Sequence, residues 1–144
     1  MKRIIAAIAL IVTLLCAFGL STTVLADEKQ KVVYHLSEAE KVNFVLSNIK
    51  NHIEGMGGPE NVEIILVAHG PGLKAFHEIE ASDQLKSMIT NLQSEGVQFN
   101  ACGNTMRAQG VELSDLLPGF VRVDQGGVVR IAQLQQQGYI YIRP

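Results

Sequence analysis

Short apolar runs alternate with helical patterns along most of this chain, and this alternation limits its possible folds more than any other feature. Five runs have the length and composition of strands: residues 31–36, 62–68, 97–101, 120–123 and 139–142. The second is apolar at every position except Glu63, as expected of a strand that is covered on both faces. Strands that alternate with helices are typical of βαβ units. We therefore expect a single α/β domain, a three-layer α/β/α sandwich with a mainly parallel five-stranded sheet.

The segments between these runs predict helices with recognisable ends. Ser37 and Glu40 have the spacing of a capping box, and the apolar residues after them recur at helical intervals (Val42, Val45, Leu46, Ile49 and Ile53). Ser82 is expected to cap another helix, which Gly96 stops and which has an apolar stripe of its own (Leu85, Met88, Ile89 and Leu92).

Two further helices are predicted in the second half of the chain. Asn104 is expected to cap a short helix that Gly110 closes. A last helix follows Gly126 and Gly127, ends at Gly138, and is expected to turn three apolar side chains inward (Val128, Ile131 and Leu134).

The first residues are typical of a targeting segment. Lys2 and Arg3 precede an uncharged apolar run over residues 4–20, and Val24-Leu25-Ala26 follows it. This pattern predicts a signal peptide over residues 1–26 with cleavage after Ala26, and a domain over residues 27–144. We therefore expect a periplasmic or secreted protein. The alternative is an N-terminal membrane anchor, because the apolar run is just short of a typical membrane span.

Cys102 is the only cysteine that remains after such cleavage, so a disulfide within the domain is excluded. It lies in Ala101-Cys102-Gly103-Asn104-Thr105, between the third predicted strand and a predicted short helix. We expect a partly exposed thiol at the positive end of a helix dipole. Backbone amides of residues 103–105 and the Thr105 hydroxyl would favour its thiolate. The other interpretation is a buried cysteine that only fills space.

Two histidines occupy corresponding positions along the chain. His35 is near the end of the first predicted strand and His69 is just past the second. Ligands of open parallel sheets gather at the carboxyl ends of the strands, so both are expected to approach Cys102. His69 is a candidate base or proton donor for the thiol, or an anion contact above the turn that begins at Gly70. Its alternative role is a hydrogen bond to backbone. His35 is interpreted as structural, and His52 and His77 as surface residues.

Several classes of function lack support in the sequence. The net charge is −2 and no basic cluster is present, so a nucleic-acid partner is not expected. A dithiol oxidoreductase would need a Cys-x-x-Cys motif, and a hydrolase a nucleophile elbow or paired carboxylates. Gly70-Pro71-Gly72 lacks the lysine of a phosphate-binding loop. No cofactor and no dedicated metal site are predicted, and no membrane contact is expected unless the N-terminal segment is retained.

Four segments together resemble the DsrE/DsrF-like superfamily, in its small, single-domain, exported branch. They are residues 31–36, 67–70, 99–105 and 134–142, of which the cysteine-centred segment is the most specific. The resemblance implies the same three-layer fold and a homo-oligomer such as a trimer or hexamer. Better-studied relatives pass sulfur as a cysteine persulfide, in sulfur oxidation and in tRNA thiolation. The resemblance therefore implies that Cys102 bears the sulfur. A tRNA-modifying role is not expected, because the N-terminus predicts export.

These observations predict a sulfur-handling protein that accepts sulfane sulfur on Cys102 and transfers it to a partner thiol. Such a carrier needs one accessible thiol of low pKa and no resolving cysteine. Cys102 and His69 are the candidate catalytic residues, and the candidate binding residues are their neighbours (Gly70, Gly103, Asn104 and Thr105). The partners would be a sulfur donor and an acceptor protein or small thiol. The alternative is an oligomeric module without turnover that binds a small ligand or a soft metal through thiolate and imidazole.

Overall fold

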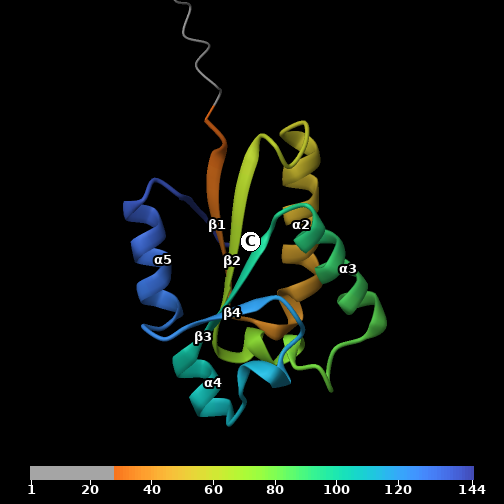
Figure 1. The fold of residues 1–144 in the computed structure, drawn as a ribbon, viewed down its shortest axis with the longest axis vertical. Helices are drawn as coiled ribbons and strands as arrows, with labels where there is room; N and C mark the ends of the chain where they lie inside the picture. Colours follow the sequence, from red (N-terminus) through yellow and green to blue (C-terminus); the bar gives the residue numbers. More distant parts are fainter. Residues whose placement is uncertain (1–27) are drawn as a thin grey trace, which may run out of the picture.

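The structure is a computed structural model that describes residues 28–144. The expected signal peptide and its cleavage site therefore lie outside the described residues. Strands and helices alternate as the sequence predicts (Figure 1): β1 (Gln30–Leu36), η1 (Ala39–Lys41), α2 (Val42–Gly55), β2 (Val62–Ala68), η2 (Gly70–Phe76), α3 (Asp83–Ser94), β3 (Gln98–Cys102), α4 (Gly103–Gln109), η3 (Leu113–Asp115), β4 (Phe120–Val123), α5 (Gly127–Gln136) and β5 (Ile140–Ile142).

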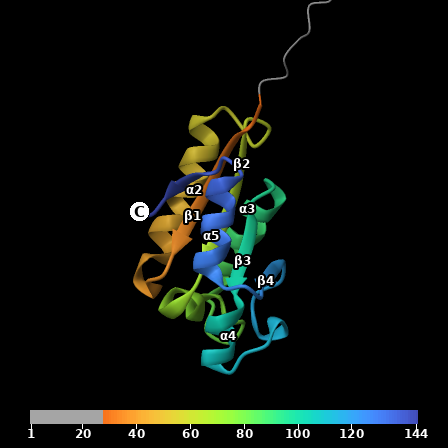
Figure 2. The same cartoon turned by 90° about the vertical axis from the view of Figure 1, so that its left-hand side faces the viewer.

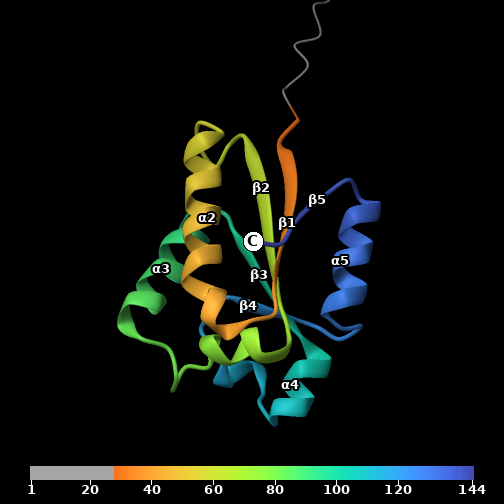
Figure 3. The same ribbon diagram turned by 180° about the vertical axis from the view of Figure 1, so that it is seen from behind.

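The sheet has five parallel strands in the order β4-β3-β2-β1-β5. Helices α2 and α3 cover one face and α5 covers the other, as the side view (Figure 2) and the view from behind (Figure 3) show. The structure thereby confirms the three-layer α/β/α sandwich. Because β4 and β5 form opposite edges, the chain crosses the whole sheet between them, and α5 is the element that makes this crossing.

Each face of the sheet carries its own apolar layer. The larger layer lies under α2 and α3, and the buried residues of α2 are the five that the helical spacing predicts (Val42, Val45, Leu46, Ile49 and Ile53). The smaller layer joins strand residues to two residues of α5 (Val33, Ile65, Val67, Ile131 and Leu134). Full burial of one such side chain contributes about 1.5–3 kcal/mol, so the larger layer dominates stability.

The expected inward position of Val128 is wrong, because 67% of this residue is exposed. Helix α5 buries Gly127, Ile131 and Leu134, which follow one another at intervals of one helical turn. Val128 is one position past Gly127 and therefore points about 100° away from that face. Helix α5 is held over β3 by a hydrogen bond as well, from Arg130 Nε to Oδ1 of the buried Asn100 at 3.1 Å.

The ends of the helices confirm part of the prediction. Ser82 caps α3, since its hydroxyl accepts from the Leu85 amide at 3.2 Å, and Gly110 ends α4 in the left-handed conformation. The capping box at Ser37 and Glu40 is wrong, because the chain first makes the short η1 turn and the Ser37 hydroxyl donates to Glu38 instead. No helix within residues 28–144 has the length and apolar character that a membrane span requires.

Candidate functional site

The carboxyl ends of β1, β2 and β3 bring three reactive side chains to one edge of the sheet. Each of these side chains lies two residues beyond a strand residue on the sheet face that α5 covers. His35 follows Val33, His69 follows Val67, and Cys102 follows Asn100 in this way. Because successive side chains of a strand alternate between faces, all three point to the α5 side. The position of Gly127, the first residue of α5, confirms that Cys102 and His69 converge as expected. A Cβ atom built on Gly127 would lie 3.3 Å from the Cβ of both Cys102 and His69.

Cys102 occupies the junction between β3 and α4, where it is the residue that precedes the helix. The strand runs into the helix without a loop, so Asn104 lies inside α4, and its expected role as the cap is wrong. The thiol is also less accessible than expected, since only 5% of Cys102 is exposed. The start of α5 covers the sulfur, and the Gly127 amide donates a hydrogen bond to Sγ at 3.1 Å.

The hydrogen bonds at the sulfur favour its anion. Burial raises the pKa of the Cys102 thiol. Hydrogen bonds from the Thr105 hydroxyl and from the Gly127, Thr105 and Asn104 amides lower the pKa by more than burial raises it, so the net pKa is below its ordinary value. The Thr105 hydroxyl is itself fixed, since it accepts from the Gly70 amide at 2.9 Å. The predicted binding residues Gly70, Asn104 and Thr105 therefore gather at Cys102, two of them through backbone amides.

Gly103 has a different role from its neighbours. It is buried, and a Cβ at this position would lie 3.0 Å from the Val123 carbonyl oxygen and 3.2 Å from the Asp124 Cα. Gly103 thus lets the backbone after β4 pass close to the start of α4. That backbone leads directly into Gly126 and Gly127, so its close approach contributes to the position of the α5 amide at the sulfur.

Replacing Gly103 by alanine should lower the free energy of unfolding by about 1–3 kcal/mol, because the nearest atoms are backbone and cannot move aside cheaply. Urea denaturation measures this change. Gly55→Ala is the matched control: it also adds a methyl to a helical glycine, but nothing lies within 4 Å, so it should stabilise by about 0.5–1 kcal/mol. Equal effects at the two positions would contradict the packing role of Gly103.

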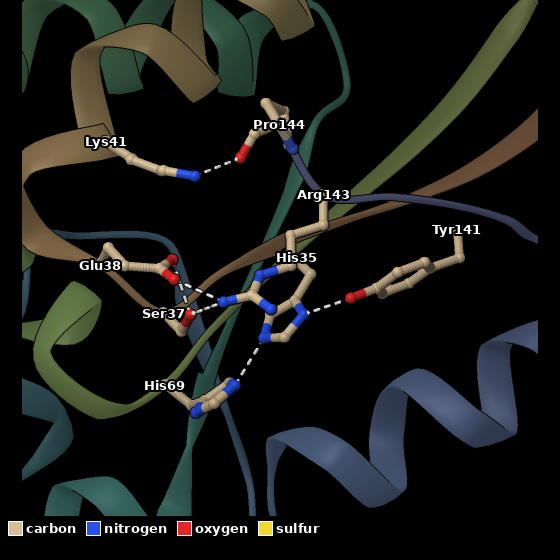
Figure 4. A network of polar contacts seen from close by, with 8 residues as sticks. All are labelled: His35, Ser37, Glu38, Lys41, His69, Tyr141, Arg143 and Pro144. Atoms are coloured by element: carbon tan, nitrogen blue, oxygen red, sulfur yellow. Dashed lines mark hydrogen bonds and ion pairs between the residues drawn. The ribbon is translucent and has the colours of Figure 1, made fainter.

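His35 and His69 form a contact that includes Tyr141 of β5 (Figure 4). The Nε2 atoms of the two histidines are 2.5 Å apart, and His35 Nδ1 is 2.6 Å from the Tyr141 hydroxyl. The two imidazole rings stack with centroids 4.7 Å apart. Each contact requires one hydrogen between its two atoms, and two neutral imidazoles with one phenol supply them in either direction along the chain. Tyr141, His35 and His69 are therefore arranged as a short path for a proton.

Both histidines favour the neutral form. Burial lowers the pKa of His35 to about 4, with further lowering by the charges of His69 and Arg143 and an opposing effect of Glu38. Burial and Arg143 also lower the pKa of His69. Arg143 lies beside the pair because its guanidinium donates to Ser37 Oγ at 3.0 Å and forms an ion pair with Glu38 (Figure 4).

The expected partnership of His69 with the thiol takes an indirect form. Within residues 28–144 no hydrogen bond joins His69 to Cys102: the imidazole contacts His35, and the sulfur accepts from Gly127. His35, interpreted from the sequence as structural, belongs to this cluster. Sequence reasoning missed Tyr141 and Arg143, because only the pairing of β5 with β1 brings them to His35.

The interpretation of His77 as a surface residue is wrong. His77 is 9% exposed, and its Nε2 lies 2.9 Å from Oε1 of Gln109 in α4. His52 is half-buried and links Tyr34 to Gln30 through its two ring nitrogens, at 3.0 and 2.8 Å. Both imidazoles fill structural positions that the sequence does not reveal.

Metal binding finds little support in this arrangement. Among the described residues no three His, Cys, Asp or Glu side chains are grouped so that they could hold an ion. The Nε2 atoms of His35 and His69 face each other rather than a shared empty position. A soft metal would therefore require the two rings to separate first.

Comparison with known proteins places this geometry in a family. The profile of the DsrE/DsrF-like family matches residues 30–144, which include every element of the fold. The chain belongs to this family. The match confirms the resemblance that the cysteine-centred segment indicates. No curated protein matches this DsrE/DsrF-like chain.

Solved structures support the same assignment. This DsrE/DsrF-like protein is similar to the protein of unknown function MTH1491 from Methanobacterium thermoautotrophicum, with 34% identity and a TM-score of 0.71 over 81% of this chain and 100% of that one. It shares its fold with ychN from E. coli (14% identity, TM-score 0.61, 80% and 100% covered). The same holds for BT1422, of unknown function, from Bacteroides thetaiotaomicron (15% identity, TM-score 0.59, 79% and 95% covered).

Proposed function

We propose that this protein is a sulfur carrier in which Cys102 accepts a sulfane sulfur and passes it to another thiol. The observation that supports the proposal most directly is the environment of Sγ, where the Gly127 amide at 3.1 Å and the Thr105 hydroxyl stabilise a thiolate. Family membership supports a sulfur-related role independently of this geometry. Cys102 is the only cysteine of residues 28–144, so no neighbouring thiol of the domain would expel the sulfur as a disulfide.

The transfer consists of two nucleophilic displacements at the transferred sulfur atom. Neither displacement requires an external oxidant or reductant. In the first, the Cys102 thiolate attacks the outer sulfur of a donor persulfide. A bond forms between Sγ and that sulfur, the S–S bond of the donor breaks, and the donor leaves as a thiolate. In the second, an acceptor thiolate attacks the outer sulfur of the Cys102 persulfide. The Cys102 thiolate is the leaving group, so donors that stabilise this anion assist both steps.

The histidine pair is assigned a supporting role in this proposal. His69 lies at the same edge of the sheet as Cys102 and packs against the same Gly127, without a hydrogen bond to the sulfur. Because burial and Arg143 lower its pKa, its imidazole is neutral and adds no positive charge next to the thiolate. The path through His35 to Tyr141 ends at a residue that is 39% exposed. A proton released when a donor persulfide or acceptor thiol ionises at the site has a route to solvent along these three groups.

Access to the sulfur is limited, which restricts the donors that the site admits. Only 5% of Cys102 is exposed, and the side-chain-free Gly127 is the covering residue. We propose that the outer sulfur of a donor reaches Sγ beside the Gly127 amide, which donates to the sulfur at 3.1 Å. A slender persulfide fits this approach better than a bulky electrophile does.

Incubation with glutathione persulfide at neutral pH tests the function. We expect the intact protein to gain the mass of one sulfur atom, the added sulfur to map to the peptide that contains Cys102, and a second thiol to remove it. Protein alkylated beforehand at Cys102 is the control and should gain nothing. Absence of loading in protein whose Cys102 is shown to react with a small alkylating reagent would refute the proposal.

A further inference from the structure

A cavity of about 450 Å³ lies between the η2 turn and α4, beside the site described above. Pro71 and Lys74 of η2 line one wall, and Asn104, Thr105 and Ala108 of α4 line the other. Cavities of this volume hold small molecules. The cavity therefore has room for a compound of low molecular weight next to Cys102.

The two walls of the cavity are fixed to each other by hydrogen bonds. The Gly70 amide, at the start of η2, donates to the Thr105 hydroxyl at 2.9 Å. Gln109 Nε2, at the end of α4, donates to the Gly70 carbonyl oxygen at 2.9 Å. Both ends of α4 are thus tied to η2, so the cavity is formed before any ligand arrives, as is usual for sites that bind small molecules.

The cavity leads to the sulfur along α4. A Cβ atom built on Gly126 would lie 2.6 Å from Asn104 Nδ2, so the amide group that lines the cavity also packs against the backbone at Gly126. The next residue is Gly127, whose amide donates to the Cys102 Sγ at 3.1 Å. A molecule that fills the cavity and extends past Asn104 therefore arrives where we place the approach of the outer sulfur.

The cavity carries positive charge that no carboxylate of the described chain neutralises. Lys74 is exposed and forms no ion pair within residues 28–144, whereas Lys50 pairs with Glu54 at 3.6 Å. Arg107 also forms no ion pair in this part of the chain, and its guanidinium donates to Asn104 Oδ1 at the rim of the cavity. A ligand with a carboxylate would supply the missing partner.

We propose that this cavity binds the carboxylate-bearing body of a small thiol persulfide, with Lys74 as the anion contact. Pro71 and Ala108 offer apolar surface to the methylene groups that separate carboxylate and sulfur in such a compound. The substrate class of the site is then low-molecular-weight acidic thiols rather than thiols of protein partners. The inference deepens the proposed sulfur-carrier function, on which it rests for its biological meaning, but the binding step can be measured without sulfur transfer.

S-methylglutathione is the probe that tests this binding step, because it has both carboxylates of glutathione and no sulfur to transfer. We expect its addition to nitrogen-15-labelled protein to cause saturable chemical-shift changes at the amides of Gly70, Thr105 and Ala108. Lys74→Gln should weaken the affinity by about fivefold, the upper end for an ion pair exposed to solvent. The diethyl ester of the probe, which lacks both charges, should bind equally to wild type and Lys74→Gln.

Two further variants separate the cavity from general effects of charge and folding. Lys50→Gln removes the same charge from α2 and should leave the affinity unchanged. Ala108→Leu fills the cavity and should abolish the saturable shifts. Because Ala108 is exposed and leucine is a good helix former, this variant should retain the fold, which circular dichroism verifies.

Three results would overturn the inference: no saturable shift in the wild type, an unchanged affinity in Lys74→Gln, or the same shifts with inorganic phosphate at equal concentration. None of them bears on whether Cys102 carries sulfur, which the mass gain with glutathione persulfide decides. Conversely, S-methylglutathione that binds as expected to a protein without sulfur uptake would refute the carrier function and keep the binding site. The two failures are therefore distinguishable.

Discussion

Replacing Cys102 by serine should abolish sulfur loading and leave the fold intact. A hydroxyl at this position is not ionised at neutral pH and cannot form a persulfide, so the mass gain expected with glutathione persulfide should disappear completely. The serine oxygen still accepts a hydrogen bond from the Gly127 amide, as the sulfur does at 3.1 Å. Serine is also a favoured residue before a helix, which suits the position ahead of α4. Stability should therefore change by no more than about 1 kcal/mol.

Cys102→Ala is the matched control for this substitution. It removes the same thiol but also removes the acceptor, so the Gly127 amide is left without a partner at a buried position. That loss should lower the free energy of unfolding by about 1–3 kcal/mol relative to Cys102→Ser. Both variants should fail to load sulfur, and only the alanine variant should be destabilised. A serine variant that still gains a sulfur atom would contradict the assignment of Cys102.

Acid should destabilise this protein through His35. The pKa of His35 in the folded protein is about 4, against an ordinary value of 6.5. Between these values the unfolded chain binds a proton that the folded protein does not, so the free energy of unfolding falls as the pH is lowered. The contribution of neutral His35 to the free energy of unfolding is fully present above about pH 6.5 and is lost as the pH approaches 4. After allowance for solvent screening of this half-buried group, the loss should be about 2 kcal/mol.

Denaturation by urea at a series of pH values between these limits measures the effect. His35→Gln retains polar atoms near Tyr141 and His69 but cannot be protonated, so its stability should fall less steeply with acid than that of the wild type. His52→Gln controls for the loss of an imidazole elsewhere, since His52 bonds to Tyr34 rather than to this cluster. Parallel stability profiles of wild type and His35→Gln would refute the role assigned to His35.

The strands and the main core were predictable because their signals are local. The run over residues 62–68 is apolar almost throughout, and the structure has a strand with those bounds, Val62–Ala68, at the centre of the sheet. The stripe of α2 repeats at helical spacing and is buried as a unit. A continuous apolar face indicates burial whichever element packs against it, so periodicity alone is sufficient to predict these elements.

The site was only partly predictable because its decisive contacts are not local. Cys102 and the two histidines could be placed at one edge from the ends of their strands, but the partner that covers the sulfur is 25 positions further along the chain. Gly127 reaches it only because α5 crosses the face opposite α2 and α3. The sequence predicts Asn104 as the cap of α4, whereas β3 continues directly into the helix and Cys102 is the residue that precedes it.

Tyr141 illustrates the same limit. It lies 106 positions from His35, and the two side chains meet because β5 pairs with β1 at the edge of the sheet. Strand order depends on the packing of the whole domain rather than on any short segment, so the sequence of β5 does not contain this information. Sequence patterns thus predict which residue types reach the edge of the sheet, and the topology determines which of them are neighbours.

The titration of Cys102 itself tests the central claim most directly. In protein labelled with carbon-13 at the cysteine Cβ, the chemical shift of Cys102 follows ionisation of the thiol and requires no reagent to reach the sulfur. The hydrogen bonds at Sγ predict a midpoint below the value of about 8.5 that is typical of free cysteine. A midpoint at or above that value would show that burial outweighs these bonds, and would contradict a thiolate carrier at Cys102.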